Sequence, residues 1–379
     1  MNKRSLLFAG IMLSGVTQVQ ALPYGFYDAR SVAMGNVSVA TGGITTAAFS
    51  NPGMLTVNEN DDTFALLLPA IGVQGIDDGD VIDSIDEFQE IEDQIARQGG
   101  VATFSQRSRQ IALVEGLENS SLLLNVTPAT AVVYSGDNYT WGVTLRGDAV
   151  ATVAVTNIDT SIFNPDATVQ ALGVLTTEVG LPIGTDFSVA GMQLSVGIIP
   201  KLVNVDGLSY ARSISDADVE DAFDEDSDLG SFTTLDAGIA LNILDSLRVG
   251  IVAKNLIEQK KTITKNVDTP LDISFDTQLR AGVAFDAGFA TLAADMDLLE
   301  IDPIGFESPS QMLSVGAELN TFDVFQLRAG YQSNMASGSN DPDLLSVGFG
   351  LWLGFHLDAA VVVGDDSSLG GFVQTGFRF

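Results

Sequence analysis

The C-terminal stretch Gln311–Phe379 alternates between apolar and polar positions with a period of two residues. Leu313 and Val315 alternate with Ser314 and Gly316, and the pattern resumes after each short break. A period of two places the apolar side chains on one face of a β-strand, so the stretch predicts consecutive antiparallel strands. A soluble β-sandwich alternates in the same way, and only the rest of the chain separates it from a β-barrel.

The same alternation predicts strands along most of the chain. They span residues 63–73, 122–134, 139–155, 168–181, 188–205, 232–241, 247–257, 273–285, 289–299, 313–320, 325–332, 345–353, 355–363 and 372–379. The connections between them are short and long in turn, and an even number of strands places both termini at one end. This favours an all-β fold, a transmembrane antiparallel β-barrel of about 14 strands with short turns in the periplasm and long loops outside.

Residues 76–118 depart from the strand pattern and predict a helical extracellular loop. Apolar residues recur there at spacings of three and four among acidic ones, at Ile82, Ile85, Phe88, Ile91 and Ile95. This spacing gives one apolar stripe on an acidic helix, and the glycine pair at 99–100 ends it. A second helix is expected over 101–115. The stripe favours packing on the barrel mouth, and a partner-binding surface is the alternative.

The N-terminus predicts two segments that precede the barrel. Lys3 and Arg4 stand before an apolar run, and small residues follow at the end of it, so residues 1–21 are predicted to be a signal peptide cut after Ala21. Residues 22–60 are rich in glycine and alanine without sustained alternation, which favours an N-terminal plug (hatch) inside the lumen; a periplasmic tether is the alternative. The barrel itself is expected over 61–379.

Composition narrows the classes of function. The chain of 379 residues has a formal net charge of −32, which argues against nucleic acid as a partner. It has no cysteine, which excludes disulfides, thiolate catalysis and sulfur-ligated metals. Acidic side chains are concentrated in residues 216–228, which resemble the start of a calcium-binding loop. However, Gly230 comes one residue later than such a loop requires, and Leu235 stands in place of the closing glutamate. Loose divalent binding and a solvated charge run both remain open for this loop.

If the apolar face of each strand meets lipid, the other face lines the lumen. The charged and polar residues predicted to line it are Arg146, Arg248, Arg280, Arg328, Asp236, Asp295, Glu318 and His356. They predict a ladder of salt bridges, with Glu318 opposite Arg328 across a hairpin, or a charged constriction that selects permeants. Glycines on the same face would leave room for a plug or a channel, at positions 238, 282, 316 and 348.

His356 is the only histidine, so a site with two histidine ligands is impossible. Asp358 shares its face and Ser346 lies on the neighbouring predicted strand, so a serine-histidine-carboxylate arrangement is conceivable. A lumen-facing polar residue near a turn is the favoured interpretation. We expect no catalytic residues, no bound metal and no cofactor, and the chain is not expected to be an enzyme.

Two segments carry a resemblance to a known family. The segment Asp28–Gly35 reads Asp-Ala-Arg-Ser-Val-Ala-Met-Gly, and Ala47–Gly53 ends in Asn-Pro-Gly. Both are similar to the N-terminal segment of the FadL family of outer-membrane transporters, and closer still to the branch described as conjugal transfer TraF-like. The resemblance implies a 14-stranded barrel with an N-terminal hatch, in which the plug residues are Phe49, Asn51 and Pro52. The usual Asn-Pro-Ala is replaced here by Asn-Pro-Gly, and the acidic helical hairpin fits the TraF-like branch better.

The expected function is a plugged channel in the outer membrane of a Gram-negative bacterium, for passive uptake of small hydrophobic or amphiphilic molecules. The alternative is a structural or interaction protein of that membrane with a closed lumen, whose loops bind a surface or envelope-complex partner. A pocket next to Asn51 would favour transport, whereas a plug without voids would favour the alternative. The expected partners are outer-membrane lipid, lipopolysaccharide, the barrel-assembly machinery that reads Phe379, and a small hydrophobic ligand.

Overall fold

The computed structural model describes residues 20–21, 28–57, 62–118, 120–217, 226–265, 270–302, 309–321, 324–337, 339, 342–364 and 368–379. All but the last two residues of the predicted signal peptide lie outside the described residues. The ends of the predicted plug, 22–27 and 58–60, and the acidic stretch 218–225 lie outside them as well.

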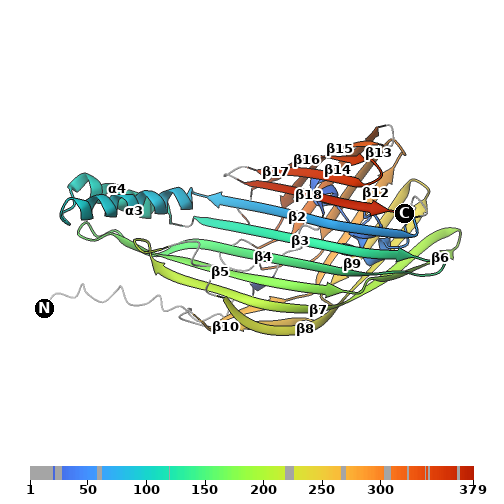
Figure 1. Ribbon diagram of the computed structural model, residues 1–379, viewed down its shortest axis with the longest axis horizontal. Coiled ribbons are helices and arrows are strands. Elements are labelled where there is room, and N and C mark those ends of the chain that lie inside the picture. The colour runs from blue at the N-terminus through green and yellow to red at the C-terminus, as the bar shows by residue number, and fades with distance from the viewer. Residues whose placement is uncertain are drawn as a thin grey trace.

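A single antiparallel sheet closes into a barrel (Figure 1). Its strands are β2 (Phe64–Asp78), β3 (Ser121–Ser135), β4 (Thr140–Asp159), β5 (Asp166–Gly180), β6 (Ile183–Val189), β7 (Met192–Ser213), β8 (Asp226–Leu244), β9 (Leu247–Lys254), β12 (Gln278–Asp286), β13 (Ala290–Asp297), β14 (Met312–Thr321), β15 (Phe325–Asn334), β16 (Leu344–Trp352), β17 (His356–Gly364) and β18 (Leu369–Arg378). The ladder closes because β18 pairs with β2 and β3 pairs with both β2 and β4. The sheet has 15 strands, of which β5 and β6 share one position between β4 and β7, so the prediction of about 14 strands is confirmed.

One predicted turn is wrong. Residues 182–187 were expected to connect two strands, but the chain continues through them as β6 and reverses at Ala190–Gly191. Pro182 only interrupts the strand, because the N–H of Leu181 still donates to the carbonyl of Pro200 on β7. Ala190 and Gly191 have φ of 52° and 81°, the geometry of the two-residue turns that match strand twist.

A second difference concerns the predicted strand 273–285. Its first residues form β11 (Leu271–Phe275), which leaves the barrel and pairs with β10 (Gln259–Ile263) and β1 (Gln20–Ala21) in a separate sheet of three strands. The barrel strand β12 begins only at Gln278. Apolar side chains of this small sheet pack against β5, β7 and β8, in a cluster that includes Val203, Phe232, Ile263 and Ile273.

The barrel wall is much taller on one side. β7 has 22 residues and β4 has 20, whereas β15 has 10 and β13 has 8. At ~3.3 Å per residue, twelve extra residues extend a strand by roughly 40 Å. The long strands therefore rise well beyond the short ones, as the left half of Figure 1 shows.

A helical hairpin stands at the tall end. It consists of α3 (Val81–Arg97) and α4 (Phe104–Gly116), which starts with a capping box between Thr103 and Gln106. The predicted hairpin is confirmed, and its apolar stripe packs with side chains of β4, β5 and β7. Ile82 was wrongly placed in the stripe: it is exposed, and Val81 is buried instead because the helix begins there. Arg109 donates two hydrogen bonds to Glu87 and lowers the pKa of that carboxyl.

No helix among the described residues is both long and apolar enough to cross a membrane.

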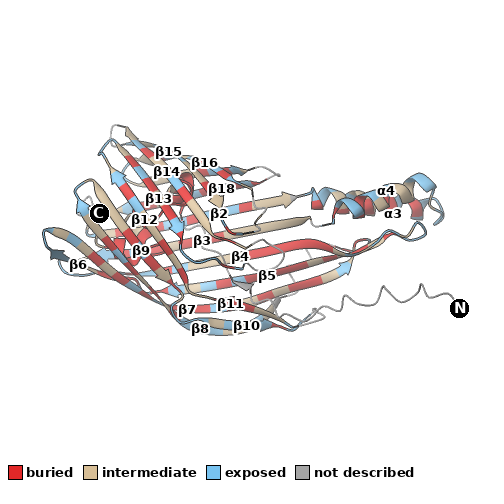
Figure 2. Ribbon diagram, turned by 180° about the vertical axis from the view of Figure 1, so that it is seen from behind, coloured by how far each residue is buried: buried red, intermediate tan, exposed pale blue. Residues whose placement is uncertain are grey.

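The outer face of the short strands carries an apolar band. Leu327, Val347 and Val373 are exposed there, whereas the residues that alternate with them are mostly buried (Figure 2). Aromatic rings contact one another near the short turns, in the pairs Tyr134–Trp141, Phe325–Phe349, Phe355–Phe377 and Phe64–Phe379. An apolar band with an aromatic girdle is typical of a barrel in lipid.

Candidate functional site

Residues 28–57, which we call the lumen segment, lie inside the barrel (Figure 1) and are almost entirely buried. The segment forms three short helices, α1 (Ala29–Ala33), α2 (Ile44–Ala47) and the 3-10 helix η1 (Pro52–Met54). None of its described residues belongs to a strand. The wall therefore holds the segment by side-chain hydrogen bonds and packing rather than by a β-ladder.

The start of α1 is fixed to the last two strands. Asp28 caps the helix, because its carboxylate accepts hydrogen bonds from the Ser31 N–H at 2.9 Å and the Ser31 hydroxyl at 2.6 Å. The next N–H, of Ala29, donates to the Gln374 side-chain oxygen at 3.0 Å, and the Gln374 amide donates to Asp358 at 2.9 Å. These contacts tie the helix N-terminus to β17 and β18.

A chain of charged groups joins α1 to β14, β15 and β17. Arg30 donates to both carboxylate oxygens of Glu318, at 2.9 Å each, and to the carbonyl of Thr41 at 2.6 Å. Glu318 also accepts from Arg328 at 2.6 Å, and Arg328 donates to Asp358 at 2.6 Å. Glu318 and Arg328 are directly opposite across the β14–β15 hairpin. Each buried charge therefore has an opposite partner, which a charge removed from water requires.

Arg280 is fully buried and is held from two sides. It donates to Asp297 through two bonds of 2.6 and 3.0 Å and reaches the Asn36 carbonyl of the lumen segment at 3.5 Å. The other buried carboxylate near the start of α1, that of Asp28, caps the helix instead.

Asp295 on β13 holds the turn that follows α1. Its Oδ2 accepts from the N–H groups of Ser38 and Val39, at 2.7 and 2.9 Å. Arg248 on β9 reaches the next residue along, since it donates to the Ala40 carbonyl at 3.2 Å. Two charged residues of the wall thus satisfy successive backbone groups of one turn.

Asn51 joins three parts of the molecule through one side chain. Its Oδ1 accepts from the Gly53 N–H at 2.9 Å, and its Nδ2 donates to the carbonyls of Val39 at 2.7 Å and Ile239 at 3.3 Å. Pro52 occupies the first position of η1, where its missing N–H costs no hydrogen bond. Asn51 therefore caps η1, donates a hydrogen bond to the turn at Val39 and donates another to β8.

Phe49 packs in the lumen against β2, β3 and β9. Its side chain lies in a buried apolar cluster with Leu67, Ala129 and Val252. Its carbonyl accepts from the Lys254 ammonium at 2.6 Å.

Eight glycines of the wall, each on a different strand, let the lumen segment lie directly on the sheet. A Cβ built on any of them would collide with or press against atoms of the lumen segment. We call these positions the glycine seats, and they are Gly184, Gly197, Gly238, Gly250, Gly282, Gly316, Gly330 and Gly348. The four glycines expected to face the lumen are among them. The other four were not singled out by the sequence pattern.

Arg146 and Asp236 belong to a second charged cluster on β4, β5, β7 and β8. Arg146 donates to Asp148 at 2.5 Å, while Lys201 lies 3.0 Å from both Glu178 and Asp236. Together with the contacts of Arg280 and Arg328, this arrangement gives paired charges on several strands of the wall.

His356 and Ser346 do not form a catalytic pair. In the register of β16 and β17, Ser346 is opposite Val362 and His356 is opposite Trp352, six residues away along the strand. The Ser346 hydroxyl accepts from the Gly35 N–H at 2.9 Å, and His356 contacts Arg378. A serine nucleophile needs its base within hydrogen-bond reach, so this geometry does not support the conceivable triad. No group of acidic or histidine side chains in the described ranges could hold a metal ion.

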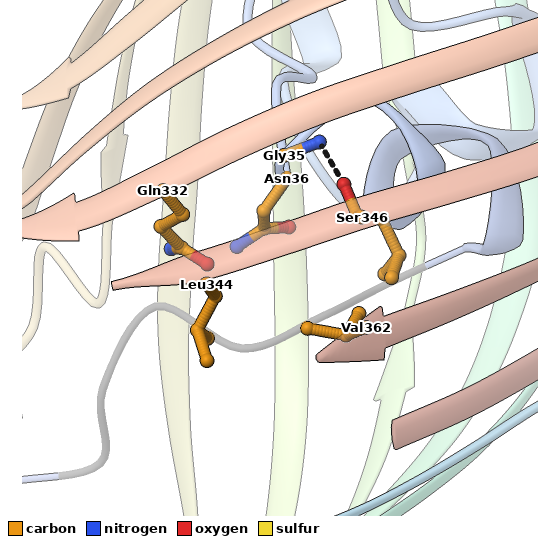
Figure 3. Close-up of a pocket in the computed structure, with 7 residues that line it drawn as sticks. Gly35, Asn36, Gln332, Leu344, Ser346 and Val362 are labelled. Carbon is orange, nitrogen blue, oxygen red and sulfur yellow. Dashed lines mark hydrogen bonds between the residues drawn. The ribbon is translucent and has the colours of Figure 1, made fainter. Parts of the chain in front are cut away.

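Two small pockets border the lumen segment. Figure 3 shows the first, where Gly35 and Asn36 face Gln332 and Leu344. Val32 also lines this pocket, which has no room for a water molecule. Both polar atoms of the buried Asn36 amide lack a hydrogen-bond partner. The second pocket has a volume of about 20 Å³, space for about one water molecule, between residues 40–41 and the turns after β8 and β12. Neither pocket adjoins Asn51.

A family model described as "F plasmid transfer operon, TraF, protein" matches residues 48–297. The chain belongs to this TraF family. The matched residues include Phe49, Asn51 and Pro52 as well as the helical hairpin. No curated protein matches the sequence.

Solved structures show the fold of this TraF family member. It is similar to the toluene transporter TbuX of Ralstonia pickettii, with 13% identity, a TM-score of 0.54 and coverage of 93% of this chain and 98% of the other. It is also similar to a toluene transporter TodX of P. putida, with 13% identity, a TM-score of 0.51 and coverage of 93% of this chain and 99% of the other. A FadL homologue of Pseudomonas aeruginosa has 11% identity, a TM-score of 0.55 and coverage of 93% of this chain and 98% of the other. Both parts of the predicted resemblance are therefore confirmed: the fold is a FadL-like barrel, and the family is that of TraF.

Sequence reasoning missed several residues that hold the lumen segment of this TraF family member. Arg30 stood inside the recognised N-terminal sequence without an assigned role, and Gln374 and Lys254 were not singled out. The alternation of inward and outward side chains along each strand could have identified Gln374 and Lys254. Gln374 has the parity of Arg378, and Lys254 has the parity of Arg248, so each faces the lumen.

Proposed function

We propose that the chain is a channel in the outer membrane of a Gram-negative bacterium, closed by its lumen segment, for passive uptake of small hydrophobic or amphiphilic molecules. The observation that carries this proposal is that the described lumen segment shares no ladder with the wall. It can therefore move without breaking the hydrogen bonds that keep a barrel stable in lipid. Opening such a gate breaks packing contacts and hydrogen bonds of side chains, but no β-ladder.

The class of permeant is supported by the structural neighbours. The similar structures include two toluene transporters and a monoaromatic hydrocarbon channel. The outer-membrane location is supported by the apolar band and aromatic pairs of the outer face.

The alternative is an outer-membrane interaction protein whose lumen stays closed. The observation in its favour is the small size of the two pockets beside the lumen segment, of which the larger holds about one water molecule. The two functions differ in one respect that can be measured, because transport requires the lumen segment to be displaced.

The test is a chain that lacks residues 24–56 but keeps the residues before them. Gel mobility of the unheated protein reports whether the barrel has formed. We expect a formed barrel with a higher conductance in planar bilayers and faster entry of a hydrophobic fluorescent dye into cells. Cells are needed for the dye, since lipopolysaccharide and not a plain lipid bilayer is the barrier to such molecules.

Two outcomes would contradict the proposal. A formed barrel with the conductance and dye entry of the full chain would leave no gate in the lumen segment. If the deletion prevents barrel formation, the point variant Arg30→Gln serves instead, because it keeps the whole chain. Unchanged conductance and dye entry in that variant would favour the closed-lumen alternative.

A further inference from the structure

The end of the helical hairpin farthest from the short turns exposes large apolar side chains. Val101 and Phe104, which flank the start of α4, are each 75% exposed. Phe163, in the connection between β4 and β5, is 88% exposed, and Ile162 beside it is also exposed. Phenylalanine is usually buried, so two such residues at protruding positions are an informative observation.

These residues belong to adjoining parts of one surface. Ala102, next to Val101, and Ile158, near the end of β4, pack against the same buried cluster beneath α3 and α4. Figure 1 shows the connection between the two helices and the connection between β4 and β5 at the same end of the molecule. We call this surface, formed by Val101, Phe104, Ile162 and Phe163, the apolar tip.

An acidic face runs along α3 and ends near the apolar tip. Asp83, Asp86, Glu90 and Asp93 are exposed on α3 at spacings of three and four, which puts them on one side of the helix, opposite its buried stripe. Residues 81–118 contain eight acidic and three basic residues. The three arginines are already engaged, because Arg97, Arg107 and Arg109 form ion pairs with acidic residues of α3.

We propose that the apolar tip and the acidic face of α3 form a docking surface for a cationic, amphipathic segment of another protein. Its apolar side chains would cover Phe104 and Phe163, and its basic side chains would meet the carboxylates of α3. Charge decides between possible occupants. A second copy would bring the same acidic face, and lipopolysaccharide would bring phosphates, so both would be repelled.

This surface is independent of the proposed channel. None of its residues contacts the lumen segment through the hydrogen bonds and ion pairs of the described residues. Interfaces of this type take affinity from a few desolvated aromatic residues and specificity from the charges around them.

The test uses the full chain in lipid nanodiscs and a synthetic amphipathic helix of leucine and lysine as the probe. Binding is measured by fluorescence anisotropy at about 50 and 200 mM salt, where screening differs. The control probes are a helix of leucine and glutamate and a scrambled leucine-lysine peptide without an apolar face. Phe104→Ser with Phe163→Ser removes the apolar tip, and Asp83→Asn with Asp86→Asn and Glu90→Gln removes acidic charge. Leu353→Ser, at an exposed residue on the short-turn end, is the matched control.

We expect the leucine-lysine helix to bind and each set of substitutions at the docking surface to weaken it by roughly tenfold, as the loss of aromatic burial or of several charges implies. Leu353→Ser should bind as the unchanged chain does. Because Phe104 and Phe163 are exposed, circular dichroism should show the fold retained. If both sets of substitutions leave the affinity for the leucine-lysine helix within twofold of that of the unchanged chain, the proposal is overturned. Tip-dependent binding of lipopolysaccharide vesicles, or tip-dependent self-association of the nanodiscs, would also overturn it.

Discussion

Arg30 and Glu318 lie 288 positions apart in the sequence and meet through two parallel hydrogen bonds of 2.9 Å. One residue belongs to the lumen segment and the other to the wall, so this bidentate pair fastens α1 to β14. Glu318 keeps a second arginine, Arg328, at 2.6 Å. The carboxylate therefore stays paired if Arg30 is lost, which makes Arg30 suitable for a clean substitution.

Arg30→Gln should loosen the lumen segment while the barrel stays folded. Hydrogen bonds to charged groups contribute about 1.5 to 3 kcal/mol, which corresponds to roughly a tenfold to hundredfold larger open population. Single-channel recording should show that increase as more frequent openings. Arg97→Gln breaks the exposed pair with Asp93 and serves as the control. An equal rise in both variants would mean that the effect comes from net charge alone.

Gly330→Ala should displace the lumen segment, because the new Cβ would overlap backbone atoms of Met34 and Gly35. Gly371→Ala is the matched control, since a Cβ there meets nothing within 4 Å. The chain has no cysteine, so a single Ala40→Cys can report the change through a water-soluble thiol reagent. We expect fast labelling with Gly330→Ala and slow labelling with Gly371→Ala. Equal slow labelling would show that the wall yields instead of the segment.

Phe88→Ala should undock the helical hairpin. Phe88 is fully buried in the cluster between the hairpin and the tall strands, and removal of such a ring costs about 3 to 5 kcal/mol. Ile82→Ala, at an exposed position of the same helix, should cost less than about 1 kcal/mol. Hydrogen exchange over residues 81–116, followed by mass spectrometry, measures the difference. Comparable exchange in the two variants would contradict the buried stripe described for α3.

Phe379 should matter for assembly in two separable ways. Its backbone extends the β18–β2 ladder that closes the barrel, because its carbonyl accepts from Thr63 and Phe64 and its N–H donates to Phe64. Deletion of Phe379 removes these bonds and the ring, whereas Phe379→Ala removes only the ring. If the assembly machinery reads the terminal aromatic residue, both variants should reduce the amount of folded barrel in the membrane fraction several-fold. Normal amounts of folded barrel with Phe379→Ala would assign the effect of the deletion to the lost backbone bonds. Phe289→Ala is the control for the loss of an exposed aromatic residue.

The sequence predicts the barrel well because its signal is local. A period of two assigns the face of each residue, and a tight connection then places Glu318 opposite Arg328, as the register has it. The contact between Arg30 and Glu318 is of another kind. It depends on where α1 comes to rest in the lumen, and no periodicity encodes the position of a short helix against a wall.

The errors have local physical causes. Pro182 suggested a turn, but a proline where a strand is interrupted removes only one N–H donor from the ladder. The chain reverses instead at Ala190–Gly191, where two successive residues adopt positive φ. Ile82 fits the helical spacing as well as Val81 does. The backbone decides between them by starting the helix at Val81, and the sequence pattern does not fix that boundary.

The glycine seats have a mechanical consequence for the lumen segment. Where side chains separate two surfaces, they can change rotamers and let one surface slide gradually over the other. At the seats the wall offers no side chain that could adjust, because atoms of the lumen segment rest directly on the sheet over strands from β6 to β16. The segment cannot tilt away from one seat without pressing into another, so it must lift from many seats at once. Release should then be all-or-none, and current through the barrel should switch between two levels instead of widening by degrees.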